Sequence, residues 1–190
     1  MATANPFKKL DKIRVSALDQ KRSAQWYQDQ IRKLGTQRPE TYLRATNQLE
    51  NRVLVGSMYL FMYDPKTKET LPYYDTFPLI FPFKRVKGGF YGINLHYLNY
   101  GLRLRLMDAL TEYSVGQNEE RRLALSWKLL TSAAKLKPVM PCVKRYLNDH
   151  VQSRFLKVDP NDWIIMSMLP IERFESANKN QVWRDSARMV

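Results

Sequence analysis

Residues 71–98 read LPYYDTFPLIFPFKRVKGGFYGINLHYL. This stretch is dense in aromatic and β-branched residues, and residues 87–89 (KGG) supply the glycines that a tight hairpin turn needs. Residues 57–63, which read SMYLFMY, have the same character and lead into the turn-forming pair at 64–65 (DP). We therefore predict that residues 53–99 form an antiparallel sheet of three or four strands.

Two prolines limit where one of these strands can lie. Backbone N–H groups alternate sides along a strand, so Pro78 and Pro82, four residues apart, remove donors from the same side. That side cannot complete a ladder of hydrogen bonds. We predict that residues 76–83 form an edge strand or are partly irregular.

The hydrophobic period changes to that of a helix after residue 99. Leu102, Leu106 and Leu110 are spaced four residues apart, which predicts an amphipathic helix that starts at residue 100 and is broken at Gly116. Residues 119–136 repeat this helical spacing, and two glutamates stand in their first turn.

The last fifty residues carry mixed signals. Prolines at 138 and 141 end the preceding helix, and we predict a third helix over residues 142–151. Residues 153–158 predict a strand, and the segment after them fits either a second strand or a short helix. Residues 178–189 predict a short capped helix.

The N-terminal residues are more polar than the rest and contain few large apolar groups. One narrow apolar stripe predicts a helix that Gly35 stops, and residues 41–51 predict a second short helix. Such helices bury too little to be stable alone, so we expect them to dock on the core or on a neighbouring subunit. The residues of the stripe are Ala24, Tyr27, Ile31 and Leu34.

These patterns predict an α+β fold. A small antiparallel sheet, at about residues 53–99, would pack with C-terminal helices, and an extended helical N-terminal arm would precede it. We predict a basic helical arm over residues 1–52 and a single α+β core domain over residues 53–190. A length of 190 residues fits one domain with such an arm.

The chain is strongly basic. Its 31 Lys and Arg residues outnumber 18 Asp and Glu residues, which gives a formal net charge of +13. Residues 1–56 hold 11 basic and 5 acidic residues, and residues 101–150 hold 9 and 5. This excess favours a nucleic-acid partner, although an acidic protein partner or a solubilising surface would also fit.

Several classes of protein fit the composition poorly. No uncharged apolar stretch reaches the roughly 18 residues of a spanning helix, and residues 1–10 lack the apolar run of a signal peptide. Cys142 has no second cysteine to pair with, and one cysteine with two histidines precludes a zinc finger of the usual spacing. We expect a soluble protein of a reducing compartment, with no membrane contact, metal or cofactor.

Signals for catalysis are sparse. His96 and His150 are the only imidazole bases, and neither lies in a recognisable nucleophile motif. We predict that His96 is a packed, hydrogen-bonded residue. Asp64, Glu69 and Asp75, with a lysine at 66 or 68, can in principle converge as a magnesium nuclease site. However, Asp64 is better explained as a turn starter and Asp75 as a polar loop residue, so we predict no catalytic residues.

Eight basic residues are the candidate phosphate contacts. Three of them flank the predicted hairpin turn, three lie in a C-terminal region with few acidic neighbours, and two lie on the helix that starts at residue 100. In that order they are Lys84, Arg85, Lys87, Lys144, Arg145, Arg154, Arg103 and Arg105. The glycine-rich run at 87–92 lacks the Gly-Lys-Ser/Thr ending of a nucleotide-binding loop, so a hairpin turn explains it better. No zinc-finger, RRM or OB signature is present, which favours binding without sequence preference.

The chain resembles a known family in several runs. These are residues 71–98, the Leu/Arg helix after them, KPVMPCVKRYL, SRFLKVDPNDWIIMSMLPIERF and the closing VWRDSARMV. Together they resemble the small basic virion proteins of T-even-like tailed bacteriophages, over the whole chain and most clearly over residues 58–190. The resemblance implies DNA end protection or head completion, at the end of the packaged genome or the head–tail junction, and it assigns no catalytic residue.

Three hypotheses follow. The leading one is a non-enzymatic structural protein that holds the terminus of double-stranded DNA, without sequence preference, and contacts other virion proteins in an oligomeric particle. It would lie in the head–tail region of the virion, and in the host cytoplasm during assembly. One alternative is a neck, tail or baseplate adaptor that contacts only protein, and the second is a magnesium-dependent nuclease.

Overall fold

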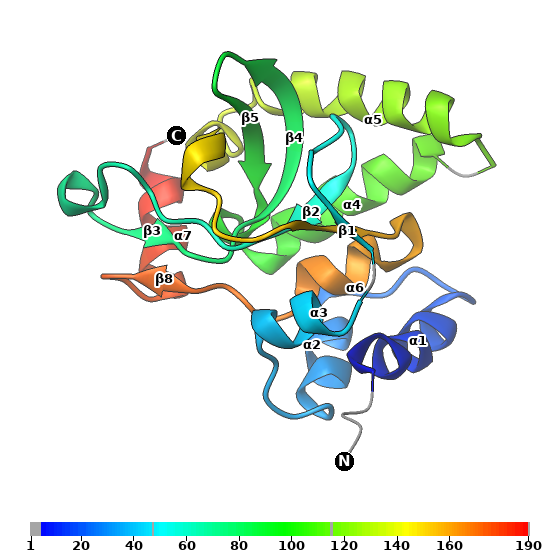
Figure 1. Ribbon diagram of the computed structural model, residues 1–190. Coiled ribbons are helices and arrows are strands. Elements are labelled where there is room, and N and C mark those ends of the chain that lie inside the picture. Colours follow the sequence, from blue (N-terminus) through cyan, green and yellow to red (C-terminus); the bar gives the residue numbers. More distant parts are fainter. Residues whose placement is uncertain (1–4, 47, 115, 190) are drawn as a thin grey trace.

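A six-stranded antiparallel sheet forms the centre of the protein (Figure 1). The computed structural model describes residues 5–46, 48–114 and 116–189, so the first four residues of the predicted arm and the last of the predicted core lie outside the described residues. The strands follow the order β1-β7-β2-β4-β5-β6. They are β1 (Leu49–Glu50), β7 (Phe155–Val158), β2 (Met58–Leu60), β4 (Leu79–Val86), β5 (Gly89–Asn94) and β6 (Val143–Leu147).

Seven helices and a second, two-stranded sheet complete the described fold, which confirms the α+β class. In Figure 1, α1–α3 gather at the end of the molecule opposite to the tip of the β4–β5 hairpin. None of the helices within the described ranges is long and apolar enough to span a membrane. The helices are α1 (Pro6–Ala17), α2 (Ala24–Arg32), α3 (Pro39–Arg44), α4 (Tyr100–Ser114), α5 (Glu119–Ala133), α6 (Trp163–Met168) and α7 (Lys179–Arg188), and the second sheet pairs β3 (Tyr74–Asp75) with β8 (Phe174–Glu175).

Two hydrophobic clusters lie on the two faces of the large sheet. In β2, Met58 and Leu60 belong to a large cluster that includes residues of all seven helices, while Tyr59 belongs to a smaller cluster on the other face. This alternation is the period of two that a strand imposes on its side chains. We call the smaller set the aromatic cluster; its buried members are Val53, Tyr59, Phe61, Tyr63, Ile80, Phe90, Tyr146 and Phe155.

The β4 strand lies inside the sheet, between β2 and β5, so the prediction of an edge strand is wrong. The alternative prediction, a partly irregular strand, is confirmed, because the β4–β5 register shifts between Pro82 and Lys84. Pro82 is tolerated since β2 pairs with β4 only as far as Ile80 and the bulge interrupts the ladder on the β5 side. The predicted hairpin turn is confirmed, and Gly88 takes the left-handed φ of +75° there.

The sheet recruits strands from outside residues 53–99. The helix predicted over residues 142–151 is wrong: this segment forms β6, which pairs with β5, followed by a short 3-10 turn (Asn148–His150). The strand predicted at residues 153–158 is confirmed as β7, and the segment after it contains a short helix, α6.

The predicted helices on the C-terminal side of the hairpin are confirmed as α4, α5 and α7. Side-chain oxygens at two of their N-termini satisfy backbone N–H groups that have no partner within the helix. Asn118 accepts from the N–H of Arg121 at the start of α5, and Asn178 accepts from the N–H of Gln181 at the start of α7.

The N-terminal helices pack on the rest of the chain. Leu10 of α1, Ile31 of α2 and Tyr42 of α3 are buried in the large cluster together with residues of α4 and α6. Gln28 also donates a hydrogen bond of 2.6 Å to the carbonyl oxygen of Met168. The expectation that these helices dock on the core is therefore confirmed, while the division into domains at residue 52 stays a prediction.

Candidate nucleic-acid interface

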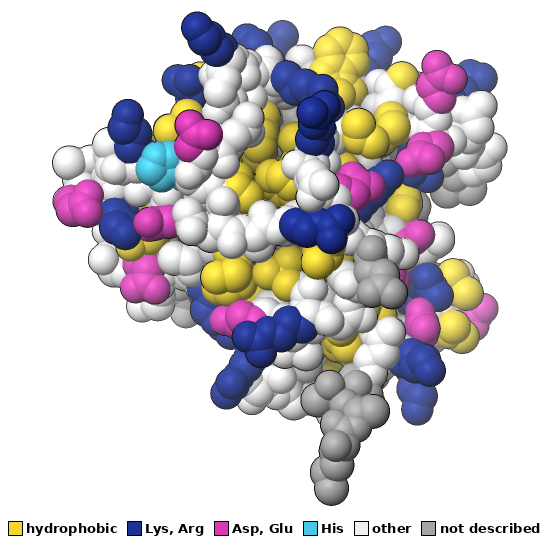
Figure 2. Space-filling model, viewed as in Figure 1, with side chains coloured by type: hydrophobic (Ala, Val, Ile, Leu, Met, Phe, Trp, Pro, Cys, Tyr) yellow, Lys and Arg dark blue, Asp and Glu magenta, His cyan; other side chains and the backbone are white. Residues whose placement is uncertain are grey.

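A groove on the outer face of the sheet brings three arginines together. It has a volume of about 750 Å³ and lies over the aromatic cluster. We call it the arginine groove; its lining residues are Asn51, Arg52, Val53, Arg85, Val86, Gly89, Phe90, Asn148, Val151, Gln152, Ser153, Arg154 and Phe155. None of these described lining residues is acidic. Figure 2 shows this face, where Lys and Arg side chains, with some Asp and Glu side chains among them, border a hollow with a hydrophobic floor.

The β-bulge in β4 decides which basic residue faces the groove. Before the bulge, Ile80 and Pro82 lie opposite Asn94 and Gly92, and after it Arg85 lies opposite Phe90. An unbroken register would have placed the residue at 84 opposite Phe90 and turned Arg85 to the other face. The bulge thus sets Arg85 above the aromatic cluster, where its Nη2 donates a 2.8 Å hydrogen bond to the carbonyl oxygen of Val53.

The opposite wall of the groove is held by Arg154. Its Nε donates to Oδ1 of Asn51 at 3.1 Å and its Nη2 donates to the carbonyl oxygen of Leu49, so this arginine joins the start of β7 to β1. Arg52 lies beside it and is exposed. Two acidic residues adjoin the lining along the chain. Glu50 accepts a hydrogen bond from Tyr59 and lies 3.7 Å from Lys157, whereas Asp149, next to Asn148, is exposed. The described lining itself therefore holds three arginines and no carboxylate.

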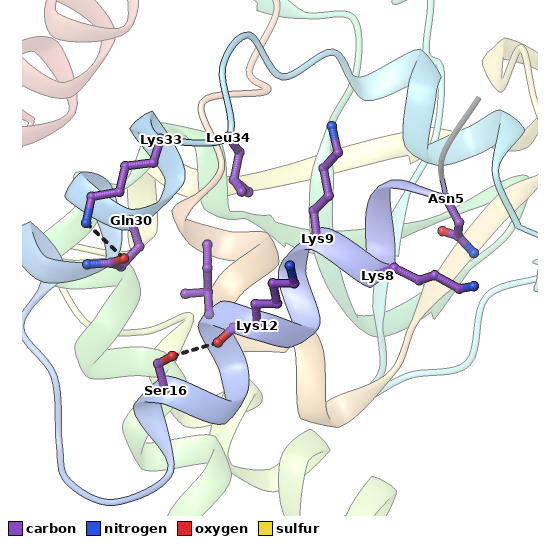
Figure 3. A pocket seen from close by; sticks show the side chains of 9 residues that line it. Asn5, Lys8, Lys9, Lys12, Ser16, Gln30, Lys33 and Leu34 are labelled. Atoms are coloured by element: carbon purple, nitrogen blue, oxygen red, sulfur yellow. Dashed lines mark hydrogen bonds between the residues drawn. The ribbon is translucent and has the colours of Figure 1, made fainter. Parts of the chain in front are cut away.

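A second basic hollow lies between α1 and the end of α2, far along the chain from the first. It has a volume of about 520 Å³, and we call it the lysine pocket for Lys8, Lys9, Lys12 and Lys33 in its wall. Figure 3 shows Lys9 and Lys12 on α1 at one side and Lys33, hydrogen-bonded to Gln30, at the other.

Two acidic residues on the helices that form the lysine pocket have other partners. Asp11 forms an ion pair of 2.8 Å with Arg14, and Asp29 forms one of 3.2 Å with Arg32. Neither carboxylate lines the pocket. No described acidic residue lines the pocket beside the four lysines.

The structure divides the predicted phosphate contacts among several places. Arg85 and Arg154 meet in the arginine groove. Lys84 and Arg145 both pair with Tyr91, from the two strands on either side of β5. This register puts them on the face of the sheet opposite to the arginine groove. Lys87 is exposed at the hairpin tip. Arg105 is exposed on α4.

Arg103 corrects the prediction made for it. Its side chain is 0% exposed, so it does not present its guanidinium group to a DNA backbone. The group donates to three carbonyl oxygens and lies over the rings of Tyr100 and Trp183. Burial lowers the pKa of Arg103, and nearby Glu172 raises it in part. The three acceptors are the carbonyl oxygens of Leu98 (2.8 Å), Ser167 (2.9 Å) and His96 (3.2 Å).

The carboxylates weighed for a nuclease have separate partners. Asp64 forms an ion pair with Lys68 at 2.8 Å, whereas Asp75 lies 2.7 Å from Nδ1 of His96. Asp75 is buried in β3, so its assignment to a polar loop is wrong, and the prediction that His96 is packed and hydrogen-bonded is confirmed. In the part of the chain that the structure describes, no group of three or more His, Cys, Asp or Glu side chains is placed to hold a metal ion.

Sequence reasoning missed Arg52 and the four lysines of the lysine pocket. Residues 1–56 hold 11 of the basic residues, and this excess was the signal that could have found them. It indicates a region and no particular residue, because only the fold decides which of these cations share a surface.

Comparison with known proteins identifies the family. The family model described as phage T4 terminal DNA protecting protein matches residues 4–186 of the chain. The chain belongs to this family. The resemblance to virion proteins of T-even-like phages is thereby confirmed, and the terminal DNA protecting family is a family of structural phage proteins. No curated protein and no solved structure matched the chain.

Proposed function

We propose that this protein binds the terminus of duplex DNA in the arginine groove and blocks exonucleases there, without cutting the DNA. The observation that carries the proposal is the meeting of three arginines around one groove that no described acidic residue lines, in a member of the terminal DNA protecting family. Phosphate contacts of this kind would give affinity without sequence preference.

The chemistry of the groove suits a phosphate backbone. Guanidinium groups bind phosphate oxygens in a bidentate manner and are more weakly hydrated than lysine ammonium groups. Arg85 and Arg154 are also held by hydrogen bonds to the chain, so they lose less conformational entropy when they bind a phosphate. Arg52, which is exposed beside them, adds a third charge.

The lysine pocket is proposed as a second phosphate contact. Lysine binds phosphate as a point charge. Three of the four lysines in the pocket wall lie on α1, and the fourth, Lys33, follows the end of α2. Contact at two surfaces would let one protein hold a longer stretch of the DNA end. It would also steepen the salt dependence of binding.

We further propose that the protein contacts other virion proteins in an oligomeric particle at the head–tail region, and that it passes through the host cytoplasm during assembly. Val15 and Leu18, at the end of α1, are exposed apolar side chains that support a protein contact.

An exonuclease protection assay tests the proposal. A blunt linear duplex would be incubated with the full chain at low salt and then digested by a double-strand exonuclease, and the half-life of the intact DNA would be measured. We expect the protein to lengthen this half-life and the variant Arg52→Ala/Arg154→Ala to lose most of the effect.

The matched control is Lys128→Ala/Arg184→Ala, which also removes two exposed charges. These residues lie on α5 and α7, which pack on the large cluster and not on the groove floor. Equal loss of protection in the two variants would contradict the groove as the site. No binding to the duplex would favour the adaptor that contacts only protein, and magnesium-dependent cleavage by the protein alone would favour the nuclease.

A further inference from the structure

A third cavity combines aromatic rings with unpaired positive charge. It has a volume of about 300 Å³, at the lower end of the roughly 300–1,000 Å³ of small-molecule sites. We call it the tyrosine pocket. Its walls include Tyr63, Tyr73, Tyr74, Tyr97 and Tyr146, with Lys66, Lys144 and Arg145 as the basic residues.

Lys144 is the unusual member of this pocket. Its side chain is half-buried, and its Nζ lies 4.1 Å from the centroid of the Tyr97 ring. No ion-pair partner lies within 4.0 Å of it among the described residues. Burial lowers the pKa of Lys144. Among the described residues, the Tyr97 ring is thus the partner of this ammonium group and no anion is, which leaves it able to pair with an anionic ligand.

Asp75, the one acidic residue among the described residues of the pocket wall, does not form an ion pair with Lys144. Oδ2 of Asp75 accepts a hydrogen bond of 3.1 Å from Asn94 and lies 2.7 Å from Nδ1 of His96. Oδ1 accepts from the backbone N–H groups of Phe77 and Arg173. Asp75 is thus occupied by its neighbours, and the open charge at the pocket is positive.

The tyrosine pocket borders the arginine groove. Leu147 lines the pocket and the next residue, Asn148, lines the groove. Tyr63 of the pocket also pairs across an isolated β-bridge with Val151 of the groove. A DNA end bound in the groove therefore lies next to the entrance of the pocket.

We propose that the tyrosine pocket binds the terminal nucleotide of a DNA strand that carries a 5′-phosphate. The phosphate would lie beside Lys144, with Arg145, which also lines the pocket, adding positive charge. The base would stack on the half-buried Tyr73 or Tyr74, because the other three tyrosines are buried. This inference rests on the proposed function, since the duplex in the neighbouring groove supplies the strand end.

The charge of the phosphate explains the choice of a 5′-terminal group. A phosphate monoester carries nearly two negative charges at pH 7, whereas each internal diester carries one. An ammonium group with no counter-charge discriminates between them in favour of the dianion. Such recognition would distinguish a true DNA end from the interior of the duplex.

Paired hairpin DNAs test the inference. Each would have one closed loop and one open blunt end, with identical sequence, and would carry either a 5′-phosphate or a 5′-hydroxyl; affinity for the full chain would be measured by fluorescence anisotropy. We expect the 5′-phosphate form to bind roughly tenfold more tightly, as a charge-assisted contact predicts. Lys144→Met should abolish this preference.

Two further variants and one further ligand keep the test decisive. Arg145→Ala changes an exposed side chain, so it should reduce the preference without unfolding the protein, and Lys128→Met removes an equal charge on α5 and should leave the preference intact. Affinity for a covalently closed dumbbell DNA, which has no end, should be the same for all four proteins. Free thymidine 5′-monophosphate would be titrated in parallel.

Each outcome decides the matter. Equal affinity for the two hairpins in the parent protein, or an undiminished preference in both Lys144→Met and Arg145→Ala, would overturn the inference. Nucleotide binding with equal hairpin affinities would assign the pocket to a free nucleotide and also overturn it. If the chain binds no DNA at all, the proposed function fails. In that case, binding of the free nucleotide that Lys144→Met removes would still support a nucleotide site in the tyrosine pocket. Absence of nucleotide binding would overturn that site as well.

Discussion

Nη1 of Arg103 donates a hydrogen bond of 2.9 Å to the carbonyl oxygen of Ser167, and this bond ties α4 to α6. The same guanidinium group reaches two more carbonyl oxygens, so one side chain connects four segments of the interior. Its task is structural, and it explains why a basic residue on a helix of a DNA-protecting protein is fully buried.

Replacement of Arg103 by methionine should therefore destabilise the fold. The carbonyl oxygens of Leu98 and Ser167 would lose the hydrogen bond from Arg103, while that of His96 would keep the one from Trp183. We expect the free energy of unfolding to fall by about 3 kcal/mol. Urea unfolding followed by tryptophan fluorescence measures this. Arg105→Ala, an exposed change on the same helix, should shift it by less than about 0.5 kcal/mol. Equal effects of the two changes would contradict the assignment.

The contact of the N-terminal helices with the core leads to a second prediction. Leu10 is 0% exposed, so Leu10→Ala should lower the free energy of the single unfolding transition by about 2–5 kcal/mol. Leu18→Ala, at a residue that is 74% exposed, should have little effect. Should Leu10→Ala leave the main transition unchanged, residues 1–52 would be an independent arm.

The approach of β6 to β5 depends on a glycine. A Cβ atom at Gly89 would lie 1.9 Å from the carbonyl oxygen of Tyr146, which is backbone and cannot turn away. We expect Gly89→Ala to cost about 3 kcal/mol. Gly88→Ala, where the left-handed φ is strained but space is open, should cost about 1–2 kcal/mol. Hydrogen exchange would check the cause, since only the change at Gly89 should expose the amides of β6.

Cys142 provides a reporter of unfolding. Its thiol is fully buried, and burial raises its pKa to about 12, so thiolate is scarce in the folded protein at pH 8. Ellman's reagent should therefore react only as the chain opens, at a rate that duplex DNA slows because it binds the folded form. Rapid labelling that DNA does not affect would show that the cysteine is accessible in the folded state.

The helices were the most predictable part of the fold. α4, α5 and α7 each carry a one-sided apolar pattern and, for the last two, an asparagine cap, which are local signals. The β6 strand was missed because it is short and lies at the edge of the sheet, where it pairs only with β5, about fifty residues earlier in the chain. No local pattern encodes such a distant partner.

The candidate site was only partly predictable for the same kind of reason. The side chain at position 85 faces the groove because a bulge shifts the strand by one residue, and the sequence shows the prolines but not the shift. Arg103 lies next to the leucine stripe of α4, and α6 and α7 cover that side of the helix as well, so the buried face is wider than the stripe indicates.

The salt dependence of duplex binding tests the groove most directly. Each phosphate contact contributes about 0.9 to the slope of log Kobs against log salt concentration, so Arg52→Ala/Arg154→Ala should reduce that slope by about 2. Lys128→Ala/Arg184→Ala should leave it unchanged. An unaltered slope in the groove variant, or the same reduction in both, would contradict the account.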